Sequence, residues 1–380
     1  MMVWRLVLAG LVVVSCLGFP EAPACAEKQD QPTLHVLNWK NYFPFDPDIP
    51  EEKGIYARSK VLQEFAARHG CRIEVDEVVN EIELRDRLLT MQGYYDVVVY
   101  SACDVQYLHK AGLLRSIPRE QLAHLPQVAK AYLKVNSALN GLYFVPYLSG
   151  TTGIIYRRDL LDQPPVSWED YFKPKASLQG RIGALDSAYS MFLCAFEHLG
   201  FGKLREDPSL LQQAADLLRG MERRQMWEVI TSDHVYLEKL LGQGQIWMTI
   251  GYSGAAARMQ RKWGAERIGY ALPTEGAEIW GDGFIIPRGV RHPQLAYAFI
   301  DYMISPEVQY EAARNLLYIP ANARAAEKIS GGGLLPSGDP LLHIPLGMYP
   351  VLSRADITSS HMEGMWRDIV SKHHSHPPGQ

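Results

Sequence analysis

The sequence lacks several features that mark common functional classes. Basic residues are not in excess, because 38 Lys and Arg stand against 42 Asp and Glu, for a formal net charge of −4. This balance, without a basic cluster, argues against nucleic acid as a partner and against a membrane-surface patch. Phosphate-binding loops, dinucleotide glycine patterns and paired Cys or His clusters are also missing. We therefore expect no metal, nucleotide or redox cofactor.

Long hydrophobic runs are missing after the N-terminus. The apolar run of residues 6–17 follows Arg5 and precedes a small-residue site at residues 24–26. This order is typical of a cleavable signal peptide, so residues 1–26 are predicted to direct export to the periplasm. A lipid-anchored form is the alternative, because residues 13–16 loosely fit a lipobox that ends at Cys16.

Cysteine is scarce in the exported part of the chain. Cys71, Cys103 and Cys194 are an odd number at wide spacing. One disulfide could form in an oxidising compartment, but the spacing does not indicate which, and small buried thiols are the favoured interpretation. The roughly 354 residues that remain after export are more than a single hydrophobic core usually organises, which suggests two domains.

The stretch of residues 143–156 organises the rest of the chain. Its β-branched and aromatic residues predict a strand, punctuated by Pro146, Gly150 and Gly153. We interpret it as a crossover strand between two lobes that hinges at the two glycines. An ordinary edge strand with a bulge is the alternative interpretation.

Strands and helices alternate on both sides of this stretch. The pattern predicts strands at residues 33–39, 72–78, 96–100, 180–185 and 245–250, and helices at residues 59–69, 83–91, 188–199, 210–221, 234–241, 253–260 and 295–304. Ser101 is expected to cap a helix that runs to Gly112. A second crossing is expected at residues 279–287, where glycines flank a strand. The sequence therefore predicts an α/β protein of two lobes, each a mainly parallel βαβ sheet flanked by helices, joined by two crossover hinge strands.

These crossings set the expected domain boundaries. Residues 27–145 with about 283–345 are assigned to one lobe and residues 146–282 to the other. Residues 346–380 are expected to form a tail that packs on the lobes, with a helix near residues 363–369 and a disordered end.

Several short motifs stand in the order of a known family. They are Asn38-Trp39 with Tyr42, Tyr95-Asp96 with Ser101, Val145-Pro146-Tyr147 with residues 150–153, Ser167-Trp168 with Lys173-Pro174, residues 280–282 with Ile286-Pro287, and Ser305-Pro306 with residues 318–322. In this the chain resembles the periplasmic spermidine/putrescine-binding proteins of ABC transporters, over about residues 33–325. The resemblance implies a two-lobed periplasmic binding protein fold. It also implies a small-molecule ligand held between the lobes and a partner in an ABC permease or another envelope transport component.

The resemblance also implies ligand-binding positions. Matching residues are Trp39, Tyr42, Ser101, Trp280, Asp282 and Tyr318, and the helix that follows residue 185 adds Asp186, Ser187 and Ser190, while Tyr252 stands beside a matched position. A diamine needs carboxylates for its ammonium groups and aromatic faces for its methylene chain. For each residue the alternative is an ordinary packing, capping or turn role.

At several matched positions, this chain lacks the charged or bulky side chains of the family. Ser187 and Ser190 stand where the family presents two acids, with Asp186 one place early, while Asn41 replaces another acid and Cys103 an aromatic residue. Gly251 stands where the family has tryptophan. Two explanations are open: the acidic loop of residues 46–52 supplies the missing charge, or the cleft is rebuilt for a neutral or apolar, lipid-like or sterol-like ligand in envelope trafficking.

An exported serine hydrolase is the remote alternative. Residues 251–255 nearly fit a nucleophile elbow around Ser253, but the final glycine is Ala255, and no convincing Asp and His follow. We therefore expect a binding protein and not an enzyme.

Overall fold

The structure is a computed structural model that describes residues 31–202, 207–331 and 360–374. The predicted signal peptide, Cys16, and residues 346–359 and 375–380 of the predicted tail lie outside the described residues.

The strands of the described chain form one hydrogen-bonded sheet. Its order is β2-β1-β3-β9-β4-β7-β5-β6, and β8 and β10 both pair with β4. The strands are β1 (Thr33–Trp39), β2 (Arg72–Val78), β3 (Val97–Ser101), β4 (Val145–Arg157), β5 (Ile182–Leu185), β6 (Trp227–Thr231), β7 (Met248–Tyr252), β8 (Ile268–Ala271), β9 (Ile279–Ile285) and β10 (Ile319–Pro320). Pairing is parallel among β1, β2 and β3 and among β5, β6 and β7, as the alternation of strands and helices predicted. Strands β4 and β9 run antiparallel between these two groups.

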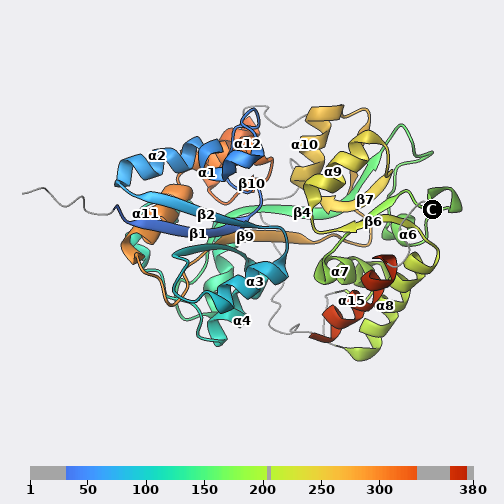
Figure 1. The fold of residues 1–380 in the computed structure, drawn as a ribbon, viewed down its shortest axis with the longest axis horizontal. Coiled ribbons are helices and arrows are strands. Elements are labelled where there is room, and N and C mark those ends of the chain that lie inside the picture. Colours follow the sequence, from blue (N-terminus) through green and yellow to red (C-terminus); the bar gives the residue numbers. More distant parts are fainter. Residues whose placement is uncertain (1–30, 203–206, 332–359, 375–380) are drawn as a thin grey trace, which may run out of the picture. The chain divides into compact units, whose positions relative to one another are not determined.

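Strand β4 crosses from one group of strands to the other (Figure 1). Residues 145–151 pair with β9, and residues 152–156 pair with β7. The edge-strand interpretation was therefore wrong, although the register of β4 on β9 does shift between Pro146 and Leu148. Because proline cannot donate to a ladder, this irregularity accommodates Pro146 inside a central strand. Strand β9 is the second predicted crossing.

The predicted helices are present, together with short helices that were not predicted. They include α2 (Lys60–His69), α3 (Glu81–Thr90), α4 (Val105–Lys110), α7 (Ala188–His198), α8 (Pro208–Arg223), α9 (His234–Gln243), α10 (Ser253–Trp263), α11 (Pro293–Met303), α12 (Pro306–Leu316) and α15 (Ser360–His374), with shorter α1 (Gly54–Arg58), α5 (Lys130–Leu133), α6 (Trp168–Phe172) and α13 (Ala323–Gly331). The prediction for Ser101 was wrong: its side chain makes no capping bond, and its hydroxyl lies 3.2 Å from the Cys103 sulfur.

Buried apolar side chains of the described residues form three clusters, which fall in two regions of the chain. One core is built from residues between Ile154 and Tyr270 together with Met362, Trp366 and Ile369 of α15. The other region combines residues between Leu34 and Leu148 with residues between Phe284 and Ala321. We call the part of the chain around the region of residues 34–148 and 284–321 lobe 1. The part around the core of residues 154–270 is called lobe 2. Helix α15 lies beside α7 and α8 in Figure 1, which agrees with its place in the core of lobe 2.

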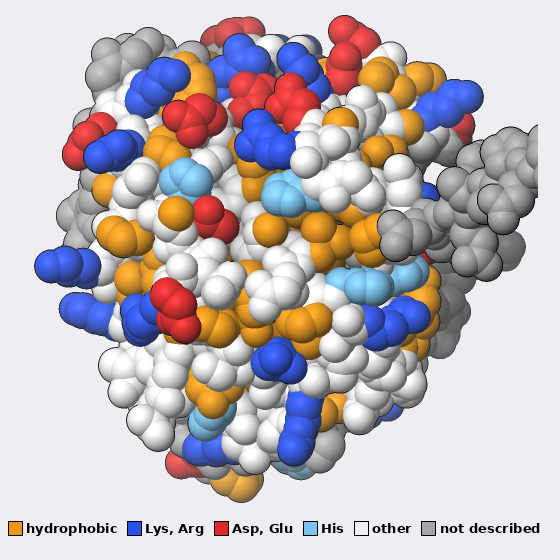
Figure 2. Space-filling model, turned by 90° about the vertical axis from the view of Figure 1, so that its left-hand side faces the viewer, with side chains coloured by type: hydrophobic (Ala, Val, Ile, Leu, Met, Phe, Trp, Pro, Cys, Tyr) orange, Lys and Arg blue, Asp and Glu red, His pale blue; other side chains and the backbone are white. Residues whose placement is uncertain are grey.

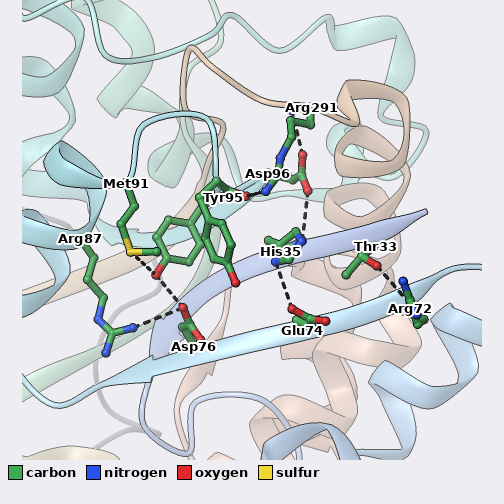
Figure 3. Close-up of polar contacts among 11 residues, drawn as sticks. Thr33, His35, Arg72, Glu74, Asp76, Arg87, Met91, Tyr95, Asp96 and Arg291 are labelled. Carbon is green, nitrogen blue, oxygen red and sulfur yellow. Dashed lines mark hydrogen bonds and ion pairs between the residues drawn. The ribbon is translucent and has the colours of Figure 1, made fainter. Parts of the chain in front are cut away.

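Polar contacts in lobe 1 hold helix α3 in place (Figure 3). The Tyr95 hydroxyl donates to Asp76 Oδ2 over 2.7 Å, and Arg87 of α3 lies 3.3 Å from the same oxygen. Asp96 is fully buried and accepts from the backbone N–H groups of His35 and Arg291, so it ties β1 to the segment between β9 and α11. These contacts matter for function because α3 borders the cleft described below.

The outer surface of lobe 1 carries charges of both signs. Figure 2 shows acidic and basic side chains interspersed with apolar ones across this end of the molecule. Within the described residues, no helix is both long and apolar enough to cross a bilayer. The predicted buried thiols are confirmed, because Cys71, Cys103 and Cys194 are free and buried.

Candidate ligand-binding cleft

A cleft of about 1410 Å³ lies between the two lobes. Its walls come from the ends of β1 and β3, from α3 and α4, from the start of α7, from α9 and from β9. All ten residues predicted from the sequence line it: Trp39, Tyr42, Ser101, Asp186, Ser187, Ser190, Tyr252, Trp280, Asp282 and Tyr318. The structure thus brings the predicted residues together, while their role in binding stays a prediction.

Aromatic rings form a continuous group within the cleft. The Trp280 ring meets Tyr318 at 5.0 Å and Tyr252 at 5.7 Å, in both cases edge to face. Tyr42 lies 5.8 Å from Tyr318. Among the described atoms, the indole N–H groups of Trp39 and Trp280 are buried without a hydrogen-bond partner. Faces of this kind attract an ammonium group and also cover methylene groups.

Two glycines make room for these rings. A Cβ on Gly150 would lie 2.6 Å from a ring carbon of Trp280, and one on Gly254 would collide with the Tyr318 ring. Gly150 and Gly153 do not adopt positive φ, so the backbone freedom expected of a hinge is not used here. Gly150 instead permits close approach of the Trp280 indole to β4.

Asp282 is the carboxylate at the centre of the cleft. It lies on β9, opposite Ser101 of β3 and Leu148 of β4. Burial, and to a smaller extent the carboxylates of Glu81, Glu278 and Asp104, raise the pKa of Asp282 to about 8, while the Tyr42 hydroxyl opposes the shift. A carboxyl whose pKa is raised in this way is mostly neutral at pH 7 unless a cation neutralises it.

Three carboxylates near Asp282 were missed by sequence reasoning. Glu81 begins α3, Asp104 follows β3, and Glu278 precedes β9 and accepts a 2.8 Å hydrogen bond from the Thr152 hydroxyl. Glu278 had a usable signal, because residues 278, 280 and 282 alternate along a strand and so share one face. All three acids line the cleft.

The acidic loop does not supply free charge to the cleft. Glu51 of this loop lines the cleft, but its carboxylate pairs with Lys40 at 2.9 Å. Asn41, which stands where the family has an acid, accepts a 2.8 Å hydrogen bond from Arg58. The other acids that line the cleft, among them Glu81, Asp104 and Glu278, come from outside residues 46–52.

The start of α7 presents small hydroxyl groups. Ser187 caps the helix by accepting from the backbone N–H of Ser190 at 3.2 Å, and its hydroxyl donates to that of Ser190 at 3.1 Å. Asp186 accepts a 2.8 Å hydrogen bond from the Trp366 indole of α15. Sequence reasoning predicted helix α15 but did not assign it to the cleft. Its residues Met362, Glu363 and Trp366 line the cleft.

Gly251 does not enlarge the cleft. A Cβ there would lie 2.6 Å from the terminal methyl of Ile155, a member of the lobe 2 core. Strand alternation places Tyr252, and not Gly251, in the wall of the cleft. The side of β7 that carries residue 251 therefore faces the core of lobe 2 and not the cleft.

Ser253 is placed as a structural residue. Its side chain is buried at the first turn of α10, and its hydroxyl accepts from the backbone N–H of Thr151 at 3.2 Å. A nucleophile elbow needs an exposed hydroxyl beside a base.

Several polar contacts join the two lobes. Lys40 of lobe 1 lies 3.6 Å from Asp233 at the start of α9. Arg85 of α3 lies 3.3 Å from Glu363 of α15. Arg258 of α10 donates to the backbone carbonyl of Leu316 at 3.0 Å. Each contact joins residues that a wider separation of the lobes would pull apart.

A cleft between two lobes joined by two crossing strands is the architecture of a solute-binding protein. The family model described as bacterial extracellular solute-binding protein matches residues 60–332. The chain belongs to this family. Its relatives include a putrescine/agmatine-binding protein of Pseudomonas aeruginosa, 28% identical over 78% of this chain and 80% of the relative. A spermidine/putrescine-binding periplasmic protein of Escherichia coli is 25% identical over 81% of this chain and 82% of the relative.

Solved structures confirm the two-lobed fold. A putative spermidine/putrescine ABC transporter protein from Listeria monocytogenes superposes with a TM-score of 0.73 at 22% identity, covering 90% of this chain and 99% of the other. A binding protein of A. tumefaciens in complex with agropinic acid gives a TM-score of 0.61 at 17% identity, covering 82% of this chain and 91% of the other. The same fold therefore holds ligands of different chemistry, and the side chains in the cleft must decide between them.

Proposed function

We propose that this solute-binding protein captures a polyamine-like cation in the cleft between its lobes and delivers it to an ABC-type permease in the bacterial envelope. The observation that carries the proposal is the half-buried carboxyl of Asp282 in the wall of the cleft. It shares the cleft with Glu81, Glu278 and Asp104, whose charges raise its pKa, and with the aromatic rings of Trp39 and Trp280. Carboxylates held close together in a buried site repel one another, and a bound dication relieves that repulsion.

The names of the relatives support the same ligand class and the same compartment. The proteins from P. aeruginosa and E. coli are named for putrescine, agmatine or spermidine, and the one from E. coli is named as periplasmic. A periplasmic location agrees with the predicted signal peptide. A binding role, without an enzyme activity, agrees with the family and with the buried Ser253.

The neutral-ligand alternative loses its two supports from the sequence. Family acids are absent at positions 187 and 190, but Glu81, Glu278 and Asp104 place charge near Asp282. Gly251 faces Ile155, so the absence of a large side chain at this position adds no space to the cleft. We therefore place the ligand among cations.

The proposal includes the predicted lobe boundaries and binding residues. Along the chain, buried residues change from the core of lobe 1 to that of lobe 2 between Leu148 and Ile154, and back between Tyr270 and Phe284. These changes support one lobe of residues 27–145 with about 283–345 and another of residues 146–282. The presence of Trp39, Tyr42, Ser101, Tyr252 and Tyr318 around one cleft supports their assignment as ligand contacts.

Replacing the central carboxyl tests the proposal. Asp282→Asn should weaken putrescine and spermidine binding by about 2–5 kcal/mol, because truncating one partner of a buried charge pair leaves the other uncompensated. Isothermal titration of the exported protein measures the change. Asp162→Asn is the control, because Asp162 pairs with Lys175 on the exposed surface of lobe 2. Unchanged polyamine affinity in Asp282→Asn, or no polyamine binding by the wild-type protein, would refute the proposal.

A further inference from the structure

The cleft is larger than a short diamine requires. Its volume of about 1410 Å³ exceeds the ~300–1,000 Å³ that is usual for small-molecule sites. Separated lobes do not explain this volume, because the lobes are in contact. The Lys40–Asp233 and Arg85–Glu363 pairs both join lobe 1 to lobe 2. Space remains in the cleft even with the lobes bridged.

Apolar side chains border this space from both lobes. The rim consists of Ile82, Leu89, Tyr107, Val235 and Tyr236, which are 47%, 37%, 38%, 36% and 45% exposed. Among the described residues nine large hydrophobic side chains are exposed, and these five all line the cleft. Single exposed apolar residues are ordinary, but a group gathered around one opening calls for a binding role.

Helix α3 places the apolar rim next to the acidic floor. Its buried face carries Leu84 and Leu88, while Glu81, Ile82 and Leu89 line the cleft. Glu81 is one of the carboxylates that raise the pKa of Asp282, and Ile82 is its neighbour in sequence. Helix α3 therefore presents a carboxylate and apolar side chains side by side to the cleft.

We propose that the preferred ligand is an amphipathic amine, that is, a polyamine-like cation carrying an apolar substituent. This inference rests on the proposed function. The ammonium end binds at Asp282 and Glu278 among the aromatic rings. The apolar substituent covers Ile82 and Leu89 of α3 and Tyr236 of α9, which removes exposed hydrophobic surface from water. A short unsubstituted diamine would leave that apolar surface exposed to solvent.

A matched pair of ligands tests the inference. Putrescine and N-hexylputrescine carry the same diamine, and only the second has an apolar substituent. The wild-type protein should bind N-hexylputrescine about tenfold more tightly in isothermal titration, because part of the hexyl chain is buried on the rim. The Ile82→Ser/Leu89→Ser variant should lose most of this preference and keep its affinity for putrescine.

Two further variants separate the rim from general effects. Tyr236→Ser removes rim surface from lobe 2 and should also lower the preference, although lobe 1 is untouched. Val166→Ser changes a side chain that is 60% exposed and lies outside the cleft, so it should keep the wild-type preference. Equal affinity for the two ligands, or a preference unchanged in both rim variants, overturns the inference and leaves the polyamine function standing. Failure of both ligands to bind wild type overturns the proposed function as well.

Discussion

At the scale of single residues, Asp282 combines two opposing demands. Burial and neighbouring carboxylates hold the pKa of this carboxyl at about 8 in the ligand-free protein. An ammonium group favours the ionised form, so binding must release the proton that Asp282 carries at neutral pH. The Tyr42 hydroxyl, which opposes the shift, is positioned to support that ionised form.

This linkage predicts a pH dependence of binding. Because the ligand-free pKa lies near 8, Asp282 is protonated over most of the range below it. Putrescine affinity should therefore rise by up to about tenfold per pH unit between pH 6 and 8 and then level off. Titrations at pH 7 in buffers of different ionisation enthalpy should show release of close to one proton.

The Asp282→Asn variant is the control for this dependence. Its residual affinity should vary little between pH 6 and 8, since no carboxyl remains at position 282 to titrate. A wild-type affinity that is flat over the same range would show that Asp282 is already ionised without ligand, which contradicts the assignment of its pKa.

At the scale of elements, α15 belongs to the core of lobe 2. Met362, Trp366 and Ile369 pack into that core, and the Trp366 indole donates to Asp186 at the edge of the cleft. The first turn of the same helix reaches lobe 1 through the ion pair of Glu363 with Arg85. A helix that begins after the residues matched by the family model thus supports both stability and the wall of the cleft.

The packing of α15 predicts a large stability effect. Trp366→Ala should lower the free energy of unfolding by about 3–5 kcal/mol, because it empties a site in the core and leaves Asp186 without its indole donor. Chemical denaturation followed by circular dichroism measures this change. Lys372→Ala, on the exposed side of the same helix, should stay within about 0.5 kcal/mol of wild type. Equal stability of the two variants would mean that α15 is not part of the core.

At the scale of the whole molecule, ion pairs between the lobes stabilise a closed cleft. Lys40 contacts Glu51 within lobe 1 and Asp233 of lobe 2, and Glu51 gives the largest contribution to its raised pKa. In hinged binding proteins, lobes joined by crossing strands move relative to each other. Contacts that exist only in the closed form slow the release of ligand.

Removing one such contact tests this interpretation. Lys40→Gln should weaken ligand binding by about 0.5–1 kcal/mol, mainly through faster dissociation, with a smaller effect at high salt. Stopped-flow fluorescence measures the dissociation rate. Lys60→Gln is the matched control, because Lys60 pairs with Glu64 within α2 and spans no cleft. Identical dissociation rates for the two variants would exclude a role of Lys40 in closure.

Local pattern was sufficient for most of the fold. Strand β1 occupies the predicted residues 33–39, and α2 ends before Gly70, whose left-handed backbone favours glycine. The two crossings were predictable because proline and glycine interrupt strands that are otherwise apolar. The cap expected from Ser101 failed, because a short 3₁₀ turn separates β3 from α4 and directs the hydroxyl to Cys103.

The sequence by itself determined the two-lobed α/β architecture and the aromatic and acidic residues on β1 and β9. These features follow from periodicity and motif order, which are local properties of the chain. Only the tertiary structure decided which charges share the cleft. Glu81 and Asp104 come from segments far from Asp282 in sequence, Glu51 is neutralised by Lys40, and Gly251 faces the core. Side-chain direction and long-range contact set these outcomes, because the electrostatics of a buried site depend on distances that periodicity does not encode.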